Sequence, residues 1–312
     1  WIFVGFVVAL GLLARVGVSF QFGGSPLWPD STYYIENAKR ILSGEGYDPF
    51  YYRGPLYSYF ISLVFDLFPN SIIALRAVQT LLWGGILFIY YFITYDFFKC
   101  RRISFIAVTL LSLHPLLIYI SGLALSETLY IFCYSLMLGG LYFYKSHDDV
   151  LVLFFAGISL GLTFLTRSSA IMFLPFIVLW LILENRQKGN RWVTHTLIFL
   201  VALFMIAFPY VKKLHDAHGE WFLQGYGNSF LWKFTVYPLY GPVDNQIENR
   251  DHLTTAQLEK IQKYTPNITE NQTRYEKNHL YKEAMSRYIR ENPKEYLLKL
   301  GGKFLNNFRL SI

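Results

Sequence analysis

Charged side chains are scarce in this chain: Asp, Glu, Lys and Arg together make up 16% of its 312 residues. An ordinary soluble domain carries about 25%, so this composition argues against that class. There are only two cysteines, Cys100 and Cys133, which excludes a scaffold built on disulfides. A Walker loop, a dinucleotide fingerprint, a nucleophile elbow and a heptad stripe are also missing.

Apolar residues are abundant instead, and they are grouped in runs long enough to cross a bilayer, which takes about 20 residues each. The hydrophobic fraction is 54% and the mean hydropathy is +0.31. The 24 Tyr and 28 Phe are typical of a protein with much surface at membrane interfaces. The net charge of +7 needs no nucleic-acid partner, because Lys and Arg fall mainly in loops. The sequence therefore predicts an all-α, polytopic transmembrane helical bundle.

The order of apolar and polar segments predicts the organisation of the chain. We expect spans at about residues 1–20, 71–98, 103–122, 126–144, 150–166, 169–184 and 192–211. These form a membrane core, 1–211, which includes an external loop, 21–70. That loop should hold an amphipathic helix over 30–42, with Tyr34, Ile35, Ala38, Ile41 and Leu42 on one face, and a second helix over 54–68 half-sunk in the membrane surface. A polar external region, 212–293, should precede the start of a further membrane helix, 294–312, so we expect the chain to be part of a longer protein.

Charge in the short loops predicts the orientation. The loops at 99–102 and 186–191 are basic, and Lys145 lies in a third short loop. Seven alternating spans put all three on one side, which should be cytoplasmic. The loop with Asp30 and Arg53, the turns before Glu127 and at Arg167, and the region 212–293 then lie on the external face.

Two carboxylates at predicted helix ends are candidates for chemistry. Asp30 follows Trp28-Pro29 at the start of the amphipathic helix, and Glu127 follows Ser126 at the start of a span. An acid near the membrane face is costly unless it has a partner or a task. Each also has a structural interpretation: Asp30 is a good N-cap, and Glu127 suits a first helical turn that Ser126 caps.

Four cations are predicted at the same membrane face: Arg53, Arg167, Lys212 and Lys213. A lipid phosphate needs such groups, because guanidinium binds phosphate oxygens in two places. The structural alternative is that cations at helix ends extend to the interface. The stretch His215-Asp216-Ala217-His218-Gly219-Glu220 fits no common zinc spacing. His114, beside Pro115, is expected to be a packed core histidine at a kink.

Four ordered stretches carry a resemblance to a known family. They are Asp30-x-x-x-Tyr34…Ala38…Leu42-x-Gly44-x-Gly46-Tyr47, then Arg53-Gly54-Pro55-Leu56-Tyr57, then Pro115…Leu125-Ser126-Glu127-Thr128-Leu129-Tyr130, and finally Gly161-Leu162-x-x-Leu165-Thr166-Arg167. A C-terminal stretch, Ala284…Ile289-Arg290-x-Asn292-Pro293-x-x-Tyr296-Leu297, also carries the resemblance. Together they resemble the dolichyl-phosphate-mannose protein mannosyltransferases and their bacterial relatives, including lipid A aminoarabinose transferases, which share the C-type membrane glycosyltransferase (GT-C) fold. The chain departs from the family pattern at Gly54, where relatives have Pro, and at Tyr210-Val211-Lys212-Lys213, where many have Trp-x-x-Arg-Asn.

The resemblance implies an inverting transfer of one sugar from a polyprenyl-phosphate carrier to an acceptor hydroxyl on a glycan, lipid or protein. Asp30 would be the general base, Glu127 would orient the acceptor or sugar, and Arg53 and Arg167, with Lys212 or Lys213, would hold the leaving phosphate. Tyr34 and Tyr57 fall in the motifs and would line the substrate site. No divalent metal is required unless the donor is a diphosphate. The absence of a large external sugar-binding domain favours a bacterial or archaeal cell membrane over the endoplasmic reticulum.

Three alternatives remain open at this point. A ligase or polymerase of lipid-linked glycans would use external arginines and a diphosphate donor. A transporter or flippase for a polar lipid would place charges at mid-membrane and show paired halves. A structural membrane subunit would leave Asp30, Arg53 and Glu127 apart in space.

Overall fold

The computed structural model describes residues 2–24, 28–48, 53–187, 189–218, 221, 255–269 and 274–306. All regular elements among these residues are helices. The chain divides into two compact units, Trp1–Leu214 and His215–Ile312, and each is treated by itself. Much of the predicted polar region 212–293 lies outside the described residues.

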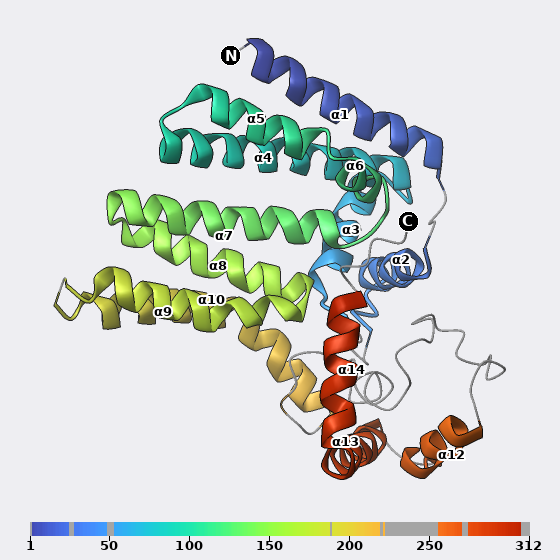
Figure 1. The fold of residues 1–312 in the computed structure, drawn as a ribbon. Helices are drawn as coiled ribbons and strands as arrows, with labels where there is room; N and C mark the ends of the chain where they lie inside the picture. The colour runs from blue at the N-terminus through green and yellow to red at the C-terminus, as the bar shows by residue number, and fades with distance from the viewer. Residues whose placement is uncertain are drawn as a thin grey trace. The chain divides into compact units, whose positions relative to one another are not determined.

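The first unit is an assembly of long helices that run side by side, with shorter helices at one end (Figure 1). Its elements are α1 (Ile2–Phe22), α2 (Pro29–Leu42), α3 (Leu56–Leu67), α4 (Ile72–Phe98), α5 (Arg101–Ser112), α6 (Pro115–Ser121), α7 (Glu127–His147), α8 (Val150–Thr166), the 3-10 helix η1 (Ser168–Phe173), α9 (Leu174–Asn185) and α10 (Arg191–His218). The polytopic helical architecture expected of the GT-C fold is confirmed.

Fewer helices meet the length and hydropathy of a membrane crossing than the seven spans predicted. Among the described residues, four helices do so alone: Phe3–Phe22, Ile72–Phe98, Ser168–Asn185 and Arg191–Asp216. The pair α5 and α6 makes a fifth if it is one span. Of the other two predicted spans, α8 is apolar but only 17 residues long. The hydropathy of α7 is lowered by its tyrosines, which are Tyr130, Tyr134, Tyr142 and Tyr144.

The predicted span 103–122 is broken. α5 ends at Ser112, α6 begins at Pro115, and the two helices are bent by 53°. Proline lacks the amide donor that a continuous helix needs, and it disfavours helical geometry at the residue before it. The kink at His114 is therefore confirmed, but the packed position expected for this side chain is wrong: it is exposed on the surface of the unit.

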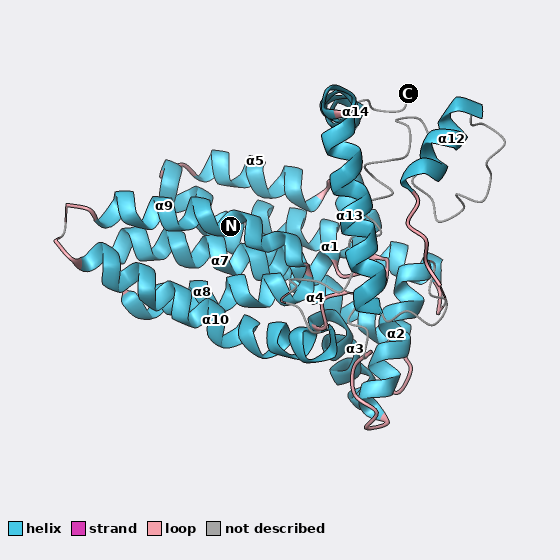
Figure 2. Ribbon diagram, turned by 90° about the horizontal axis from the view of Figure 1, so that it is seen from below, coloured by secondary structure: helices cyan, strands magenta, loops and turns pink. Residues whose placement is uncertain are grey.

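The loop between the first two long helices folds across one end of the unit. α2 and α3 pack against each other and lie crosswise to the long helices, as Figures 1 and 2 both show. The predicted apolar face of α2 is partly confirmed, because Tyr34, Ile35 and Ala38 are buried and Ile41 is half-buried. Leu42 is exposed, since the helix ends there.

The opposite end of the unit carries the three basic turns, after α4, α7 and α9 (Figure 1). Ion pairs connect the helices here: Lys145 lies 3.5 Å from Glu184, and Arg191 lies 3.0 Å from Asp148. Tyr142 of α7 donates to Asp96 of α4 at 2.7 Å. Basic turns and candidate site residues therefore occupy different ends of the bundle; that the basic end faces the cytoplasm stays a prediction.

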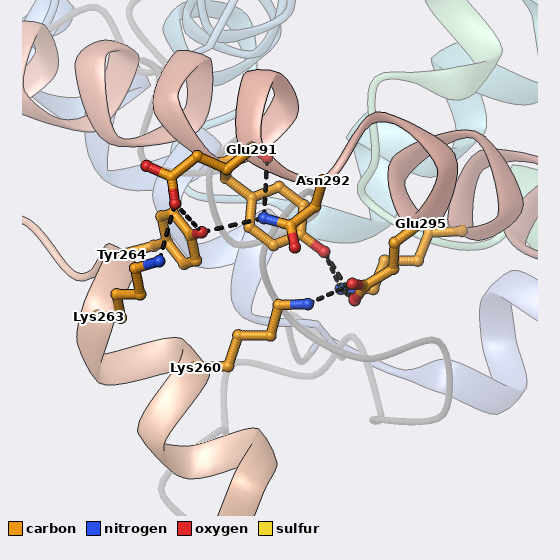
Figure 3. Close-up of polar contacts among 8 residues, drawn as sticks. Lys260, Lys263, Tyr264, Glu291, Asn292 and Glu295 are labelled. Carbon is orange, nitrogen blue, oxygen red and sulfur yellow. Dashed lines mark hydrogen bonds and ion pairs between the residues drawn. The ribbon is translucent and has the colours of Figure 1, made fainter.

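The second unit contains α12 (Thr255–Tyr264), α13 (Arg274–Glu291) and α14 (Pro293–Asn306). Its core holds Tyr264 and Tyr288, whose rings meet edge to face at 5.1 Å. Figure 3 shows the polar contacts around them, which involve three lysines and two glutamates. α14 begins at Pro293, as predicted; that it leads into a further membrane helix stays a prediction, because residues 307–312 lie outside the described part.

The candidate glycosyl-transfer site

Asp30 lies in the first turn of α2 and forms an ion pair. The helix has Trp28 as its N-cap residue and Pro29 just inside it, so Asp30 is not the cap and the capping interpretation is wrong. Its Oδ1 lies 2.6 Å from Nη2 of Arg53, and the side chain of Asp30 is 48% exposed. The carboxylate is therefore fixed by one guanidinium and still open to a ligand.

The backbone of Arg53 is held from two sides. Its carbonyl oxygen accepts from the hydroxyl of Tyr47 at 2.9 Å and from that of Tyr210 at 3.5 Å. Its guanidinium lies 5.7 Å from the ring centre of Tyr34, a distance suited to a cation–π contact. These contacts connect the loop before α3 to α2 and α10.

Asp48, in the loop after α2, is held by two hydrogen bonds. Tyr33 donates to the carboxylate of Asp48 at 2.6 Å, and the amide of Asp48 donates to Asn37 at 2.9 Å. Burial, together with the hydrogen bond to Asp48, raises the pKa of Tyr33, so its hydroxyl stays a proton donor. The loop after α2 is thus fixed to α2 itself.

Gly54 explains how Arg53 comes to lie next to the segment that carries Arg167. A Cβ at Gly54 would lie 2.2 Å from the carbonyl oxygen of Leu165 and 2.8 Å from that of Thr166. No side chain fits there, because the backbone before α3 touches the end of α8. This contact therefore requires glycine at position 54, where the family that the chain resembles has proline.

Glu127 and Arg167 form a second ion pair. The Nη2 of Arg167 binds Oε1 of Glu127, and its Nε donates to the hydroxyl of Ser126 at 3.2 Å. Ser126 has helical backbone angles and its side chain does not cap α7, so the capping interpretation of this serine is wrong. Within the described residues, Oε2 of Glu127 is buried and has no hydrogen-bond partner. The carboxylate thus keeps one acceptor atom unused.

Tyr34 and Ser126 join the two ion pairs. The hydroxyl of Tyr34 donates to Ser126 at 3.3 Å while its ring faces Arg53. Tyr57 packs edge-on against Tyr34 with ring centres 4.9 Å apart, and it is fully buried. The structure thus brings together Asp30, Arg53, Glu127 and Arg167, with Tyr34 and Tyr57 beneath them rather than on the surface.

Lys212 and Lys213 do not join this cluster in the structure. Both are exposed on α10, and neither has an ion pair within the described part of the chain. Tyr210, one turn earlier, makes the contact with Arg53 instead. No group of three or more His, Cys, Asp or Glu side chains that could hold a metal occurs among the described residues, and the side chains of His218 and Glu220 lie outside them.

Three buried polar residues of this unit were not predicted from the sequence. Arg15, Arg76 and Gln79 are fully buried, in helices that are mostly apolar. Arg15 donates to the carbonyl of Ser112 at 2.7 Å and stacks on Trp83, with 4.4 Å between the guanidinium carbon and the ring centre. The signal was present, since a charged or amide side chain inside an apolar run is costly and calls for a partner.

Comparison with known families supports one of the classes left open. The model of the dolichyl-phosphate-mannose-protein mannosyltransferase family matches residues 52–211, just over half of the chain. The chain belongs to this family. No curated protein and no solved structure gives a significant match.

Membership in the mannosyltransferase family, together with the apolar helices, makes the chain an integral-membrane glycosyltransferase of the mannosyltransferase-like type. The matched segment contains Arg53, Tyr57, Glu127 and Arg167, whereas Asp30 precedes it. The family implies a polyprenyl-phosphate sugar as donor and a glycan or protein as acceptor.

Proposed function

We propose that this protein transfers one sugar from a polyprenyl-phosphate carrier to an acceptor hydroxyl, with inversion at the anomeric carbon, on the external face of the membrane. The observation that carries the proposal is the junction of two carboxylate–arginine pairs, Asp30–Arg53 and Glu127–Arg167, through Tyr34 and Ser126. Four charged groups from separate segments meet at one end of the helical unit, where a lipid phosphate would lie.

Asp30 is the general base of this proposal. It takes the proton from the acceptor hydroxyl while the hydroxyl oxygen attacks the anomeric carbon and the bond from sugar to phosphate breaks. The half-exposed position of Asp30 suits this role, because the acceptor can reach it. Arg53 orients the carboxylate through the ion pair at 2.6 Å.

The arginines receive the leaving group. Charge grows on the lipid phosphate as its bond to the sugar breaks, and fixed guanidinium groups stabilise that charge without reorganising. Arg53 and Arg167 are each held by a carboxylate before substrate arrives, so their positions are set in advance. Lys212 and Lys213 add positive charge on the exposed surface of α10 near Tyr210.

Glu127 orients the sugar or the acceptor. Its Oε1 is bound to Arg167, whereas Oε2 accepts nothing from the described residues. A buried carboxylate oxygen without a donor is costly, and a substrate hydroxyl would supply the missing hydrogen bond.

A transfer assay tests the proposal. The purified protein is incubated with radiolabelled polyprenyl-phosphate sugars and a membrane extract as acceptor, next to Asp30→Asn and a control, Asp66→Asn. Asp66 is an exposed carboxylate near the end of α3, outside the cluster. We expect carrier consumption by the native protein and by the control, and a loss of about 100-fold or more in Asp30→Asn at unchanged carrier binding.

The other outcomes each have a clear meaning. Consumption that survives Asp30→Asn keeps the transferase but removes Asp30 as the base. Failure with every monophosphate carrier, and consumption of a diphosphate carrier, would assign the protein to the lipid-linked glycan ligases instead.

A further inference from the structure

A buried amide beneath the site has a role that neither the family match nor the charged residues describe. Gln79 of α4 is fully buried and uses all of its hydrogen-bonding groups. Its Nε2 donates to the carbonyl oxygens of Ser121 at 3.0 Å and Leu123 at 2.9 Å, and its Oε1 accepts from the hydroxyl of Tyr57 at 2.5 Å.

The two carbonyls that Gln79 binds belong to Ser121, the last residue of α6, and to Leu123 in the turn that follows. The last carbonyl groups of a helix have no partner within it, and α6 is only 7 residues long. In an apolar unit such groups are expensive to leave unpaired. From a neighbouring helix, Gln79 supplies one donor to the last carbonyl of α6 and one to the turn, so it fixes the turn that follows α6.

That turn leads directly into the site. Leu123, Ala124 and Ser126 are buried, and Glu127 begins α7 immediately afterwards. The position of the turn therefore sets where Ser126 and Glu127 stand, and through them where Arg167 is held.

Gln79 also reaches the other ion pair, through two aromatic rings. Tyr57, which donates to Gln79, packs edge-on against Tyr34. Tyr34 faces Arg53 and donates to Ser126. The same amide thus contacts the turn that precedes Glu127 and also Tyr57, whose ring packs on Tyr34 beside Arg53.

We propose that Gln79 is a positioning residue for glycosyl transfer: it sets the distance between the Asp30–Arg53 pair and the Glu127–Arg167 pair without touching substrate. The inference rests on the proposed function for its catalytic part. It changes the role expected for Tyr57, which becomes the connection between Gln79 and Tyr34 rather than a substrate contact.

The test has an activity arm. Gln79→Leu removes both hydrogen-bond donors and keeps a side chain of similar size. Tyr57→Phe removes only the hydroxyl that orients the amide. The control is Thr80→Val on the same helix, because Thr80 is also buried but donates only to the carbonyl of Arg76 in its own helix. We expect kcat to fall about 10- to 100-fold in Gln79→Leu and about 5-fold in Tyr57→Phe. Carrier KM should change less than about 2-fold, and the control should match the native protein.

A distance arm does not depend on activity. Spin labels are placed at two exposed positions, Glu36 of α2 and Leu116 of α6, after both native cysteines are replaced. We expect one narrow distance distribution in the native protein and in Thr80→Val, and a shifted or broadened one in Gln79→Leu.

The two arms separate the possible failures. An unchanged distribution in Gln79→Leu overturns the positioning role, and so does a changed distribution with native kcat. A fall in melting temperature alone, equal in Gln79→Leu and Thr80→Val, would also overturn it. If the native protein transfers no sugar, the proposed function fails, and the distance arm alone decides whether Gln79 holds the turn.

Discussion

The two units of this protein each contain a cluster of ion pairs, and the clusters differ in how completely they use their polar atoms. In the second unit, the carboxylate of Glu295 binds Lys260 and Lys299 and accepts from Tyr288 (Figure 3). In the first unit, the one ion pair of Asp30 within the described residues is with Arg53, and Oε2 of Glu127 has no hydrogen-bond partner among them.

The difference separates structural ion pairs from ones that are prepared for a ligand. The second cluster surrounds Tyr288, which is fully buried, and the carboxylate of Glu295 in this cluster has three partners. Charged side chains of both clusters keep exposed surface, so the difference lies in the acceptor atoms: in the first cluster, Oε2 of Glu127 has no partner among the described residues. A cluster with unused acceptors is the better candidate for chemistry.

The largest effect after loss of Asp30 should come from Arg167→Lys. Arg167 uses two nitrogen atoms, one for Ser126 and one for Glu127, and the single ammonium of lysine cannot reproduce both bonds. We expect kcat to fall about 100-fold at unchanged melting temperature.

The matched control is Arg191→Lys, since Arg191 is paired with Asp148 at the end of the bundle that carries the basic turns. It should remain within about 2-fold of the native activity. Equal losses of activity in both variants would mean that the Arg167–Glu127 and Arg191–Asp148 ion pairs both act by supporting the fold. The proposed difference between a site ion pair and a structural ion pair would then be wrong.

A smaller effect is expected from Gly54→Ala, which tests the contact that brings the two arginine segments together. The new methyl group would overlap the carbonyl of Leu165, and forcing the backbones apart should cost about 1–3 kcal/mol. We expect a lower melting temperature and a fall in kcat of about 10-fold.

Gly84→Ala is the control for this substitution. A Cβ at Gly84 has its nearest neighbour, a side-chain atom of Leu12, at 3.9 Å, so a methyl group fits within α4. This variant should be neutral or slightly stabilised, because alanine is the better helix residue. A stable, active Gly54→Ala protein would contradict the close contact between α3 and α8.

Local signals allowed the sequence to predict most helix ends and the identity of the charged residues at the site. Pro29 and Pro293 stand inside the starts of helices α2 and α14, and Pro115 marks the broken span. The sequence could not predict that Tyr57 is buried, because α3 is apolar enough to present either face to the unit.

Contacts between distant segments account for the rest. The bond from Gln79 to Ser121 requires the bend between α5 and α6, and the close approach at Gly54 requires α8 to end beside α3. Neither follows from periodicity, which describes one helix at a time. The ordered motifs contain the four charged residues that the structure brings together, whereas the buried partners that hold them had no motif.

The smallest effect on activity should come from Glu295→Gln, which isolates the second cluster. Burial raises the pKa of Glu295, but hydrogen bonds from Lys260, Tyr288 and Lys299 outweigh it and lower the pKa from 4.5 to about 2. A carboxylate whose pKa is lower in the folded state stabilises that state above its unfolded pKa of 4.5, and this contribution is lost as the pH falls toward 2.

Hydrogen exchange in the full-length protein measures this contribution. Protection of α13, corrected for the intrinsic pH dependence of exchange, should fall between about pH 6 and about pH 3 in the native chain and less in Glu295→Gln. Glu259→Gln, an exposed change on α12, should leave the native pH dependence intact. Transfer activity of Glu295→Gln near neutral pH should stay within about 2-fold, because its cluster is saturated by its own side chains. A loss of activity as large as that of Arg167→Lys would show that the second cluster also serves the reaction, and the division between a prepared site and a structural network would be wrong.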